Sequence, residues 1–372
     1  MFLYDFVRIQ PSFLGGFYLI LRWLSGLFGV VIIVSTLLSV VKTFVLPRNP
    51  EDWLYNQVFD GTRKLFRLPI RYLRGYAARE RFLALLAPVS LLALLPAWYG
   101  IILIGFMFLF WAVEPITFFQ AFRVSGSSLF TLGFDQFQSE ISTIIEFIEA
   151  MIGLLLVALL MAYLPTIYAA FSRRESLVTL LEIRAGSPPS AVEMIKRHFR
   201  IHGLERLNEV WRTWEAWFAD IEESHTSLPS LVFFRSPRPE RNWVSAAGAV
   251  LDGAALMLSA VDSPYDPQAA LCLRGGYIAL RSISDGFHLD YDPEPAPGDA
   301  ISISKDEFFD AIEDLRTQGV PLKQDLEAAW VDFAGWRVNY DEVLLQLAGL
   351  VLSPETQWVG DRAIQYWPRE KE

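Results

Sequence analysis

The chain has 372 residues, of which 53% are hydrophobic and 20% are charged, and its formal net charge is −10 at pH 7. Phosphate binding needs clustered Lys and Arg, so an acidic chain with no basic stripe in its second half is a poor candidate for binding nucleic acid. Cys272 is the only cysteine, which excludes an intrachain disulfide and a metal site built from cysteines.

Hydrophobic residues are concentrated in the first half of the chain. Long uncharged runs fill residues 24–171, and the residues after them have the composition of a soluble protein. We therefore predict a membrane part followed by a soluble domain at residues 176–372. Residues 1–23 form an N-terminal segment that lacks the basic start of a secretory signal, so we do not expect a signal peptide there.

The first predicted transmembrane helix covers residues 24–46. Its first 18 residues carry no charge, and a helix of this length crosses a hydrocarbon core of about 30 Å. The alternative is a buried helix of a soluble core. The linker that follows, residues 47–81, is basic, because residues 42–81 hold nine Lys or Arg against four Asp or Glu. Positive charge is typical of cytoplasmic loops, so we expect this linker in the cytoplasm.

Two further spans are expected. The uncharged run at residues 82–113 would make one helix of about 48 Å, which is too short for two crossings. We expect a single span that is kinked, or preceded by an interfacial piece, with Pro88 and Pro96 at the breaks. The third span covers residues 141–171 and is followed by Arg173 and Arg174. Two crossings separate these arginines from the basic linker, so both sites are predicted to be cytoplasmic.

The segment between the second and third spans, residues 114–140, has an unusual composition. It is too apolar for a solvated loop and too short and polar for another crossing. A re-entrant helix followed by extended backbone satisfies both observations. Such backbone is tolerated at membrane depth only where protein buries it or a water-filled cavity receives its polar groups.

Residues 125–135 resemble the end of the pore helix and the selectivity filter of the tetrameric potassium-channel family. The family signature is Thr-Val-Gly-Tyr-Gly-Asp. The corresponding residues of this chain are Thr131, Leu132, Gly133, Phe134 and Asp135. The second glycine of the signature is missing, so Phe134 is followed directly by Asp135. The resemblance covers residues 82–175, about a quarter of the chain.

The resemblance implies a pore module at residues 82–175. Its parts would be an outer helix (82–113), a pore loop (114–140) and an inner helix (141–171). The resemblance places Ser125 and Ser128 in the pore helix. It also makes Gly153, which lies 18 residues after Asp135, the hinge glycine of the inner helix. Helix packing is the alternative role for this glycine.

In that family, rings of backbone carbonyls replace the hydration shell of an ion. The resemblance therefore implies a homotetramer that conducts monovalent cations. Gly133 would supply the necessary backbone freedom, and Thr131 would supply either an inner ring of hydroxyls or a bond to its own helix. The acidic residues of 114–149 would form a vestibule that concentrates cations. For Glu146 and Glu149, the alternative is a solvated position at a helix start.

Residues 176–372 are predicted to form a cytoplasmic helical domain. Helical stretches are expected at about residues 187–223 (one helix or two), 243–262, 267–285, 305–317 and 322–350. The tryptophans of the first stretch are expected in the core or at a subunit interface. Gly275 and Gly276 are expected to serve helix packing or a turn, since no Gly-rich phosphate loop is present.

Catalytic patterns are lacking in this domain. His198 and His202 have the i, i+4 spacing that could hold a metal, but no third ligand is implied. We therefore expect no enzyme activity, no catalytic residues, no metal and no cofactor.

Together these observations predict an all-α, multi-pass protein of the cell membrane. It would have three transmembrane helices with a re-entrant pore loop, followed by a cytoplasmic helical domain. The expected function is passive, potassium-like cation conduction by a homotetramer, whose partners are the lipid bilayer and monovalent cations. The alternative is a non-conducting pseudo-channel that serves as a membrane anchor or sensor for a partner protein. A membrane-bound enzyme ranks third, because no catalytic set is visible.

Overall fold

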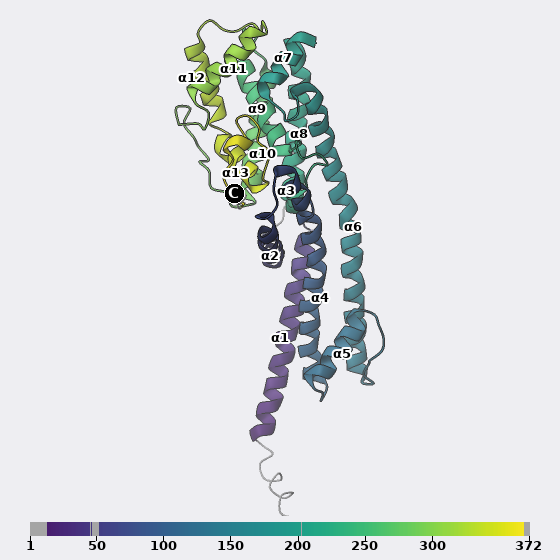
Figure 1. Cartoon of the computed structure of the whole chain (residues 1–372). Helices are drawn as coiled ribbons and strands as arrows, with labels where there is room; N and C mark the ends of the chain where they lie inside the picture. Colours follow the sequence, from purple (N-terminus) through teal and green to yellow (C-terminus); the bar gives the residue numbers. More distant parts are fainter. Residues whose placement is uncertain (1–12, 45, 47–51, 202, 368–372) are drawn as a thin grey trace, which may run out of the picture. The chain divides into compact units, whose positions relative to one another are not determined.

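The computed structural model describes residues 13–44, 46, 52–201 and 203–367. These residues form helices and no β-strand, and a single isolated bridge among them joins Val261 to Leu322. The all-α prediction is therefore confirmed for the described residues. They divide into two compact units, one within Met1–Gly61 and Val89–Thr166, the other within Thr62–Pro88 and Ile167–Glu372. Figure 1 labels the helices along the chain.

The first unit contains five helices or parts of helices. They are α1 (Phe13–Phe44), the start of α2 (Trp53–Ile70), most of α4 (Leu86–Val113), α5 (Phe118–Leu129) and the first part of α6 (Glu140–Ala185). Three stretches are long and apolar enough to cross a membrane: Tyr18–Phe44, Tyr76–Val113 and Glu140–Ala185. They correspond to the three spans expected from the sequence, and they suggest a multi-pass membrane protein.

Helices α1 and α4 pack closely because glycines lie at their crossing. A Cβ at Gly29 would be 2.5 Å from the carbonyl oxygen of Gly105, and a Cβ at Gly105 would be 2.7 Å from Ile33 Cγ1. Small residues allow two helix backbones to approach in this way. The hydroxyl of Ser25 also donates to the carbonyl of Phe108 at 3.1 Å, which helps to fix the register of the two helices.

Asp52 ties the start of α2 to the same helix pair. Its carboxylate accepts hydrogen bonds from the Tyr55 N–H at 2.9 Å and from the Ser39 hydroxyl at 2.7 Å. The Ser39 oxygen in turn accepts from the Trp98 indole N–H at 3.1 Å. Asp52 therefore acts as the N-cap of α2 and links it to α1 and α4.

The second candidate span consists of two helices. The short helix α3 (Tyr76–Leu83) is separated from α4 by Ala84 and Leu85. Three of its eight residues are charged, so the apolar part of the span lies in α4, which contains Pro96. A separate piece does precede the long helix, but the breaks expected at Pro88 and Pro96 are wrong, because the chain breaks at Ala84 and Leu85 and α4 continues through both prolines.

The second unit contains α3, the end of α6 and a helical bundle built around α9 (Trp243–Ser259). The other bundle helices are α7 (Ala191–Ile201), α8 (Leu207–Ser227), α10 (Pro267–Asp285), α11 (Lys305–Thr317), α12 (Leu326–Arg337) and α13 (Asp341–Leu350), with 3₁₀ turns at Leu204–Arg206, Pro229–Phe233 and Gly360–Arg362. Helix α9 contacts α7, α8, α10, α12 and α13. It is buried on nearly all sides, as expected for a helix with small and apolar residues all round.

The packing of α8 and α10 confirms two interpretations of the sequence. A Cβ at Gly276 would overlap the side chain of Leu251 and press on Phe218, so this glycine serves helix packing. Trp211, Trp214 and Trp217 of α8 are at most 2% exposed. Of the two expected positions for these tryptophans, the core is therefore the one observed in this chain.

The predicted helix at residues 322–350 is wrong, because the chain forms α12 and α13 there. The break lets two side chains reach Asp252 of α9. The Arg337 guanidinium lies 2.5 Å from Asp252 Oδ1, and the Tyr340 hydroxyl donates to the same oxygen at 2.8 Å. A buried carboxylate is strongly destabilising without such partners, and a hydrophobic pattern does not record this requirement.

His225 of α8 is buried beside a guanidinium in the second unit. Its Nε2 accepts from Arg174 Nη1 at 3.2 Å, and its Nδ1–H donates to the Ile221 carbonyl at 2.9 Å. Protonation would place an Nε2–H against the Arg174 donor. Burial, and then the charge of Arg174, hold the pKa of His225 well below its ordinary value of 6.5.

This depressed pKa predicts a loss of stability in mild acid. The unfolded chain binds a proton at His225 more readily than the folded chain does, so stability is present above pH 6.5 and falls as the pH drops below it. The loss reaches at most about 1.4 kcal/mol per pH unit. The melting temperature, followed from pH 8 to pH 5, should fall below pH 6.5, and less steeply in His225→Gln. A wild-type melting temperature that does not change over this range would contradict the assignment.

Candidate functional site

The segment between α4 and α6 begins with a well-capped helix. Thr117 and Gln120 form a capping box at the start of α5. The ring of Phe118 stacks on Trp111 with centroids 4.9 Å apart. Because Trp111 lies in the last turn of α4, α5 starts beside the end of that helix.

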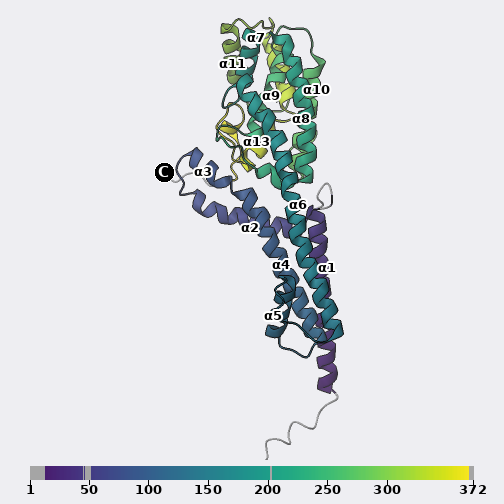
Figure 2. The same cartoon turned by 90° about the vertical axis from the view of Figure 1, so that its right-hand side faces the viewer.

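The other end of α5 lies far back along α4. Ser125 Oγ lies 3.3 Å from the Leu103 carbonyl oxygen, and the ring of Phe130 stacks on Tyr99 at 5.1 Å. Trp111 and Tyr99 are twelve residues apart, which corresponds to about 18 Å along the helix. Helix α5 therefore runs back alongside α4, and in Figures 1 and 2 it lies beside both α4 and α6.

After α5 the chain returns toward the end where it started. The Asp135 N–H donates to Ser127 Oγ at 3.0 Å, and the Phe137 N–H donates to Glu146 Oε1 at 2.8 Å. The ring of Phe137 contacts Phe110 at 5.6 Å. Helix α6 then begins at Glu140. We call residues 114–140 the α5 hairpin, since they run in along α4 and back out along α6.

The tip of the hairpin is a tight helix-ending turn. The N–H of Thr131 donates to the Ser128 carbonyl at 2.9 Å, and that of Leu132 donates to the Ser127 carbonyl at 2.8 Å. This pair of bonds is a Schellman motif, which usually has glycine where Thr131 stands. Thr131 adopts a φ of +55°, which disfavours a β-branched residue. The turn is therefore locally strained.

Six consecutive carbonyl groups, those of residues 131–136, accept no hydrogen bond from the residues that the structure describes. The Gly133 N–H is also held by the Ser127 carbonyl, at 3.3 Å, with Gly133 at a φ of +67°. The carbonyl oxygens of Thr131, Leu132 and Gly133, in contrast, belong to this row of carbonyls without a hydrogen-bond partner among the described residues. The Thr131 hydroxyl donates to the Phe130 carbonyl at 2.7 Å, so its bond to the local backbone is the one present in the single chain.

The candidate filter residues lie together on the surface of the chain. Leu132 and Phe134 are 63% and 59% exposed, although both are large and apolar. Asp135 forms an ion pair with Arg123 of α5 at 3.3 Å, and the Arg123 guanidinium lies 6.0 Å from the centre of the Phe134 ring. The carboxylate is thus partly neutralised within its own chain.

The residues predicted for the pore helix lie on α5, and the predicted hinge glycine lies on α6 where that helix packs against the end of α5. Ser125 and Ser128 both lie on α5, the first buried and the second half-buried. Helix α6 continues without a break through Gly153. A Cβ at Gly153 would overlap the Leu129 carbonyl at the end of α5. In this structure Gly153 serves helix packing, and its role as a hinge stays a prediction.

The expectation of an acidic vestibule needs a correction for two residues. Glu146 is 8% exposed and Glu149 is 0% exposed, so neither is solvated in the chain. Glu149 Oε1 accepts from the Ser125 hydroxyl at 2.5 Å, and its Oε2 has no hydrogen-bond partner among the described residues. The contact between Ser125 and Glu149 was not predicted from the sequence. A carboxylate next to a long apolar run was the signal that could have shown it.

Metal binding finds no support in the described part of the chain. No group of three or more His, Cys, Asp or Glu side chains converges there. His198 is buried with its Nδ1 2.8 Å from the Met194 carbonyl, and its predicted companion His202 lies outside the described residues.

Comparison with protein-family models, with curated proteins and with solved structures found no match to this chain. The resemblance of residues 131–135 to a selectivity filter therefore rests on the residues themselves.

Proposed function

We propose that the protein is a homotetrameric pore-loop channel that conducts monovalent cations. Helix α4 would be the outer helix, the α5 hairpin the re-entrant pore loop and α6 the inner helix. The observation that carries the proposal is the row of free carbonyls at Thr131, Leu132 and Gly133, at the tip of a hairpin packed between two candidate membrane spans.

Backbone physics supports this assignment. Unpaired carbonyls at membrane depth are strongly unfavourable unless a water-filled cavity or an ion receives them. The N–H groups of residues 131–133 are tied to the end of α5, which leaves the negative ends of these peptide dipoles available. Several copies around an axis would bring the carbonyls together as rings that can replace the hydration shell of a cation.

The exposed side chains give such copies a surface on which to meet. Leu132 and Phe134 are exposed at the tip, and Ile144, Phe147 and Met151 are exposed on α6. A closed ring of copies would cover the apolar tip. The number four is what the resemblance to potassium channels implies. By the distribution of positive charge, the second unit would lie in the cytoplasm.

A mass measurement tests the assembly. The purified chain in lipid nanodiscs should give particles that contain four copies, because one hairpin cannot enclose a pore. Leu132→Glu should shift the particles toward fewer copies, since it places four carboxylates around one axis. Val331→Glu, which changes an exposed residue of α12, should leave the mass unchanged. Wild-type particles with only one or two copies would contradict the proposal.

A non-conducting membrane anchor or sensor for a partner protein is the second candidate. One observation favours it: the Thr131 hydroxyl donates to the Phe130 carbonyl, and Thr131 closes α5 in a strained turn. These two features are enough for a hairpin whose only role is to pack between α4 and α6. The two candidates differ in whether assembled copies pass cations.

A further inference from the structure

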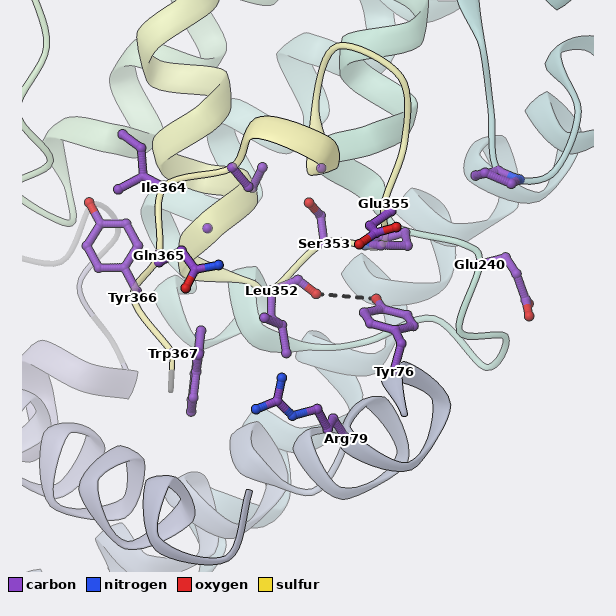
Figure 3. Close-up of a pocket in the computed structure, with 16 residues that line it drawn as sticks. Tyr76, Arg79, Glu240, Leu352, Ser353, Glu355, Ile364, Gln365, Tyr366 and Trp367 are labelled. Atoms are coloured by element: carbon purple, nitrogen blue, oxygen red, sulfur yellow. Dashed lines mark hydrogen bonds between the residues drawn. The ribbon is translucent and has the colours of Figure 1, made fainter. Parts of the chain in front are cut away.

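The second unit contains a cavity of about 680 Å³ between α3 and residues 348–367. Figure 3 shows its walls. Tyr76 and Arg79 of α3 form one wall, residues 352–355 and 363–367 form the second, and Glu240 lies at one end. A cavity of 300–1,000 Å³ is typical of sites for small organic ligands.

The α3 wall is held firmly against the rest of the unit. Glu80 forms an ion pair with Arg235 that is almost completely buried, and Arg235 also donates to the Val351 carbonyl. The Tyr76 hydroxyl donates to the Leu352 carbonyl at 3.3 Å across the cavity, as the dashed line in Figure 3 shows. The cavity is therefore preformed, and a ligand need not order its walls.

The second wall is equally well fixed. Arg362 pairs with Glu307 of α11 at 2.7 Å, just before the residues that line the cavity. The Trp367 indole N–H donates to the Leu350 carbonyl at 2.9 Å. Gly349 and Gly360 let this C-terminal segment approach its neighbours, because a Cβ at either position would overlap a backbone carbonyl.

Polar groups without partners occur at two places in the lining: Ser353 and Glu355 lie side by side, and Glu240 lies apart from them, beyond Tyr76. Among the described residues, neither the Glu240 nor the Glu355 carboxylate has an ion-pair or hydrogen-bond partner. The hydroxyl of Ser353 is buried without any hydrogen bond to the residues that the structure describes. In Figure 3 the ring of Tyr76 lies between Leu352 and Glu240. Two carboxylates, an acceptor hydroxyl and an aromatic face are groups that bind an ammonium ion.

The rest of the cavity has a different character. Leu352, Ile364 and Trp367 line it with apolar surface, and Arg79 is the cation there. A ligand that carries positive charge at both ends would meet this guanidinium, so the positive group must be at one end only. An apolar or aromatic body would then cover Leu352 and Trp367.

We propose that this cavity binds an amphipathic organic cation, an amine attached to an aromatic or aliphatic body. The ammonium group would lie beside Glu355 and donate to the Ser353 hydroxyl, with Glu240 adding negative charge from farther along the cavity, and the body would extend along Leu352 toward Trp367. This site does not depend on ion conduction, so its test and the tests of the channel are separate.

Three probes with the same ring and different charge test the proposal: tryptamine, indole and indole-3-acetate. Binding is measured by calorimetry on the full chain in detergent, with empty micelles as the blank. Tryptamine should bind about tenfold or more tighter than indole-3-acetate, because its charge is complementary to the two carboxylates. Indole should be intermediate. Tryptamine should also slow amide hydrogen exchange in Tyr76–Leu83, since it contacts α3.

Matched variants identify the groups responsible. The double variant Glu240→Gln with Glu355→Gln should remove the preference for tryptamine, whereas Asp310→Asn, which changes an exposed carboxylate of α11, should keep it. Ala363→Trp should fill the cavity and weaken tryptamine binding about tenfold. The proposal is overturned if no probe binds, if tryptamine and indole-3-acetate bind equally, or if the double variant binds tryptamine as wild type does.

Discussion

Gly153→Ala should detach the α5 hairpin from α6. The added methyl would overlap the Leu129 carbonyl, which is backbone and cannot rotate away. The Tyr99 hydroxyl donates to the Gly153 carbonyl at 2.6 Å, so a shift of α6 would also break the link from α4 to α6. Overpacking of this kind costs about 1–3 kcal/mol, which exceeds the gain of about 1 kcal/mol for Gly→Ala within a helix.

The measurement is the melting temperature of the protein in detergent, together with the mass of the nanodisc particle. Gly153→Ala should lower both the melting temperature and the fraction of assembled copies. Gly100→Ala is the matched control, because Gly100 lies in α4 with nothing within 4 Å of an added Cβ. It should melt at or slightly above the wild-type temperature. Equal behaviour of the two variants would show that α5 does not rest on Gly153.

Asp135→Asn should weaken block by external divalent cations. In an assembled pore the Asp135 carboxylates would form a ring beside the free carbonyls, and such a ring attracts divalent ions. Within each chain Arg123 offsets part of this charge at 3.3 Å. The two substitutions should therefore act in opposite directions. Asp135→Asn should raise the half-blocking calcium concentration about tenfold, and Arg123→Gln should lower it.

The measurement is the potassium current across a planar bilayer at increasing calcium concentrations, from which the half-blocking concentration is obtained. Asp310→Asn in α11 is the control and should give the wild-type curve. The three carbonyl layers proposed at residues 131–133 would replace less of a hydration shell than the longer filter of potassium channels does, so potassium should be favoured over sodium only weakly. Block that is unchanged in both variants, or strict potassium selectivity, would contradict this geometry of the loop.

Much of the helical framework could be predicted from the sequence, because the buried side of a helix appears there as a regular pattern of apolar residues. The three candidate spans are visible in the sequence as uncharged runs, and α10 and α11 have the limits expected from the sequence. The break between α12 and α13 was not predictable in this way. It places Arg337 and Tyr340 on Asp252, which is distant in sequence, and a pattern of apolar residues carries no information about that partner.

The composition of residues 114–140 predicts the position of the candidate pore loop, but it does not predict the contacts that hold this loop in place. Residues 114–140 stood out because they suit neither a solvated loop nor a span. The contact between Ser125 and Glu149, and the overlap that makes Gly153 necessary, depend on how α5 packs against α6. Likewise, the sequence shows that Arg123 and Asp135 are charged but not that they form an ion pair. Their separation depends on how the loop that carries Asp135 folds back against α5, which carries Arg123.

The central claim is that assembled copies pass cations through the turn at residues 131–133, and ion flux in liposomes tests it most directly. Tetrameric protein in liposomes loaded with potassium should release it faster than empty liposomes do. Sodium should pass at a comparable rate and chloride should not pass, since the free carbonyls attract only cations. Gly133→Val should stop the flux, because valine disfavours a φ of +67°. Folded, assembled protein that gives no flux above the empty liposomes would contradict the claim and favour the membrane anchor.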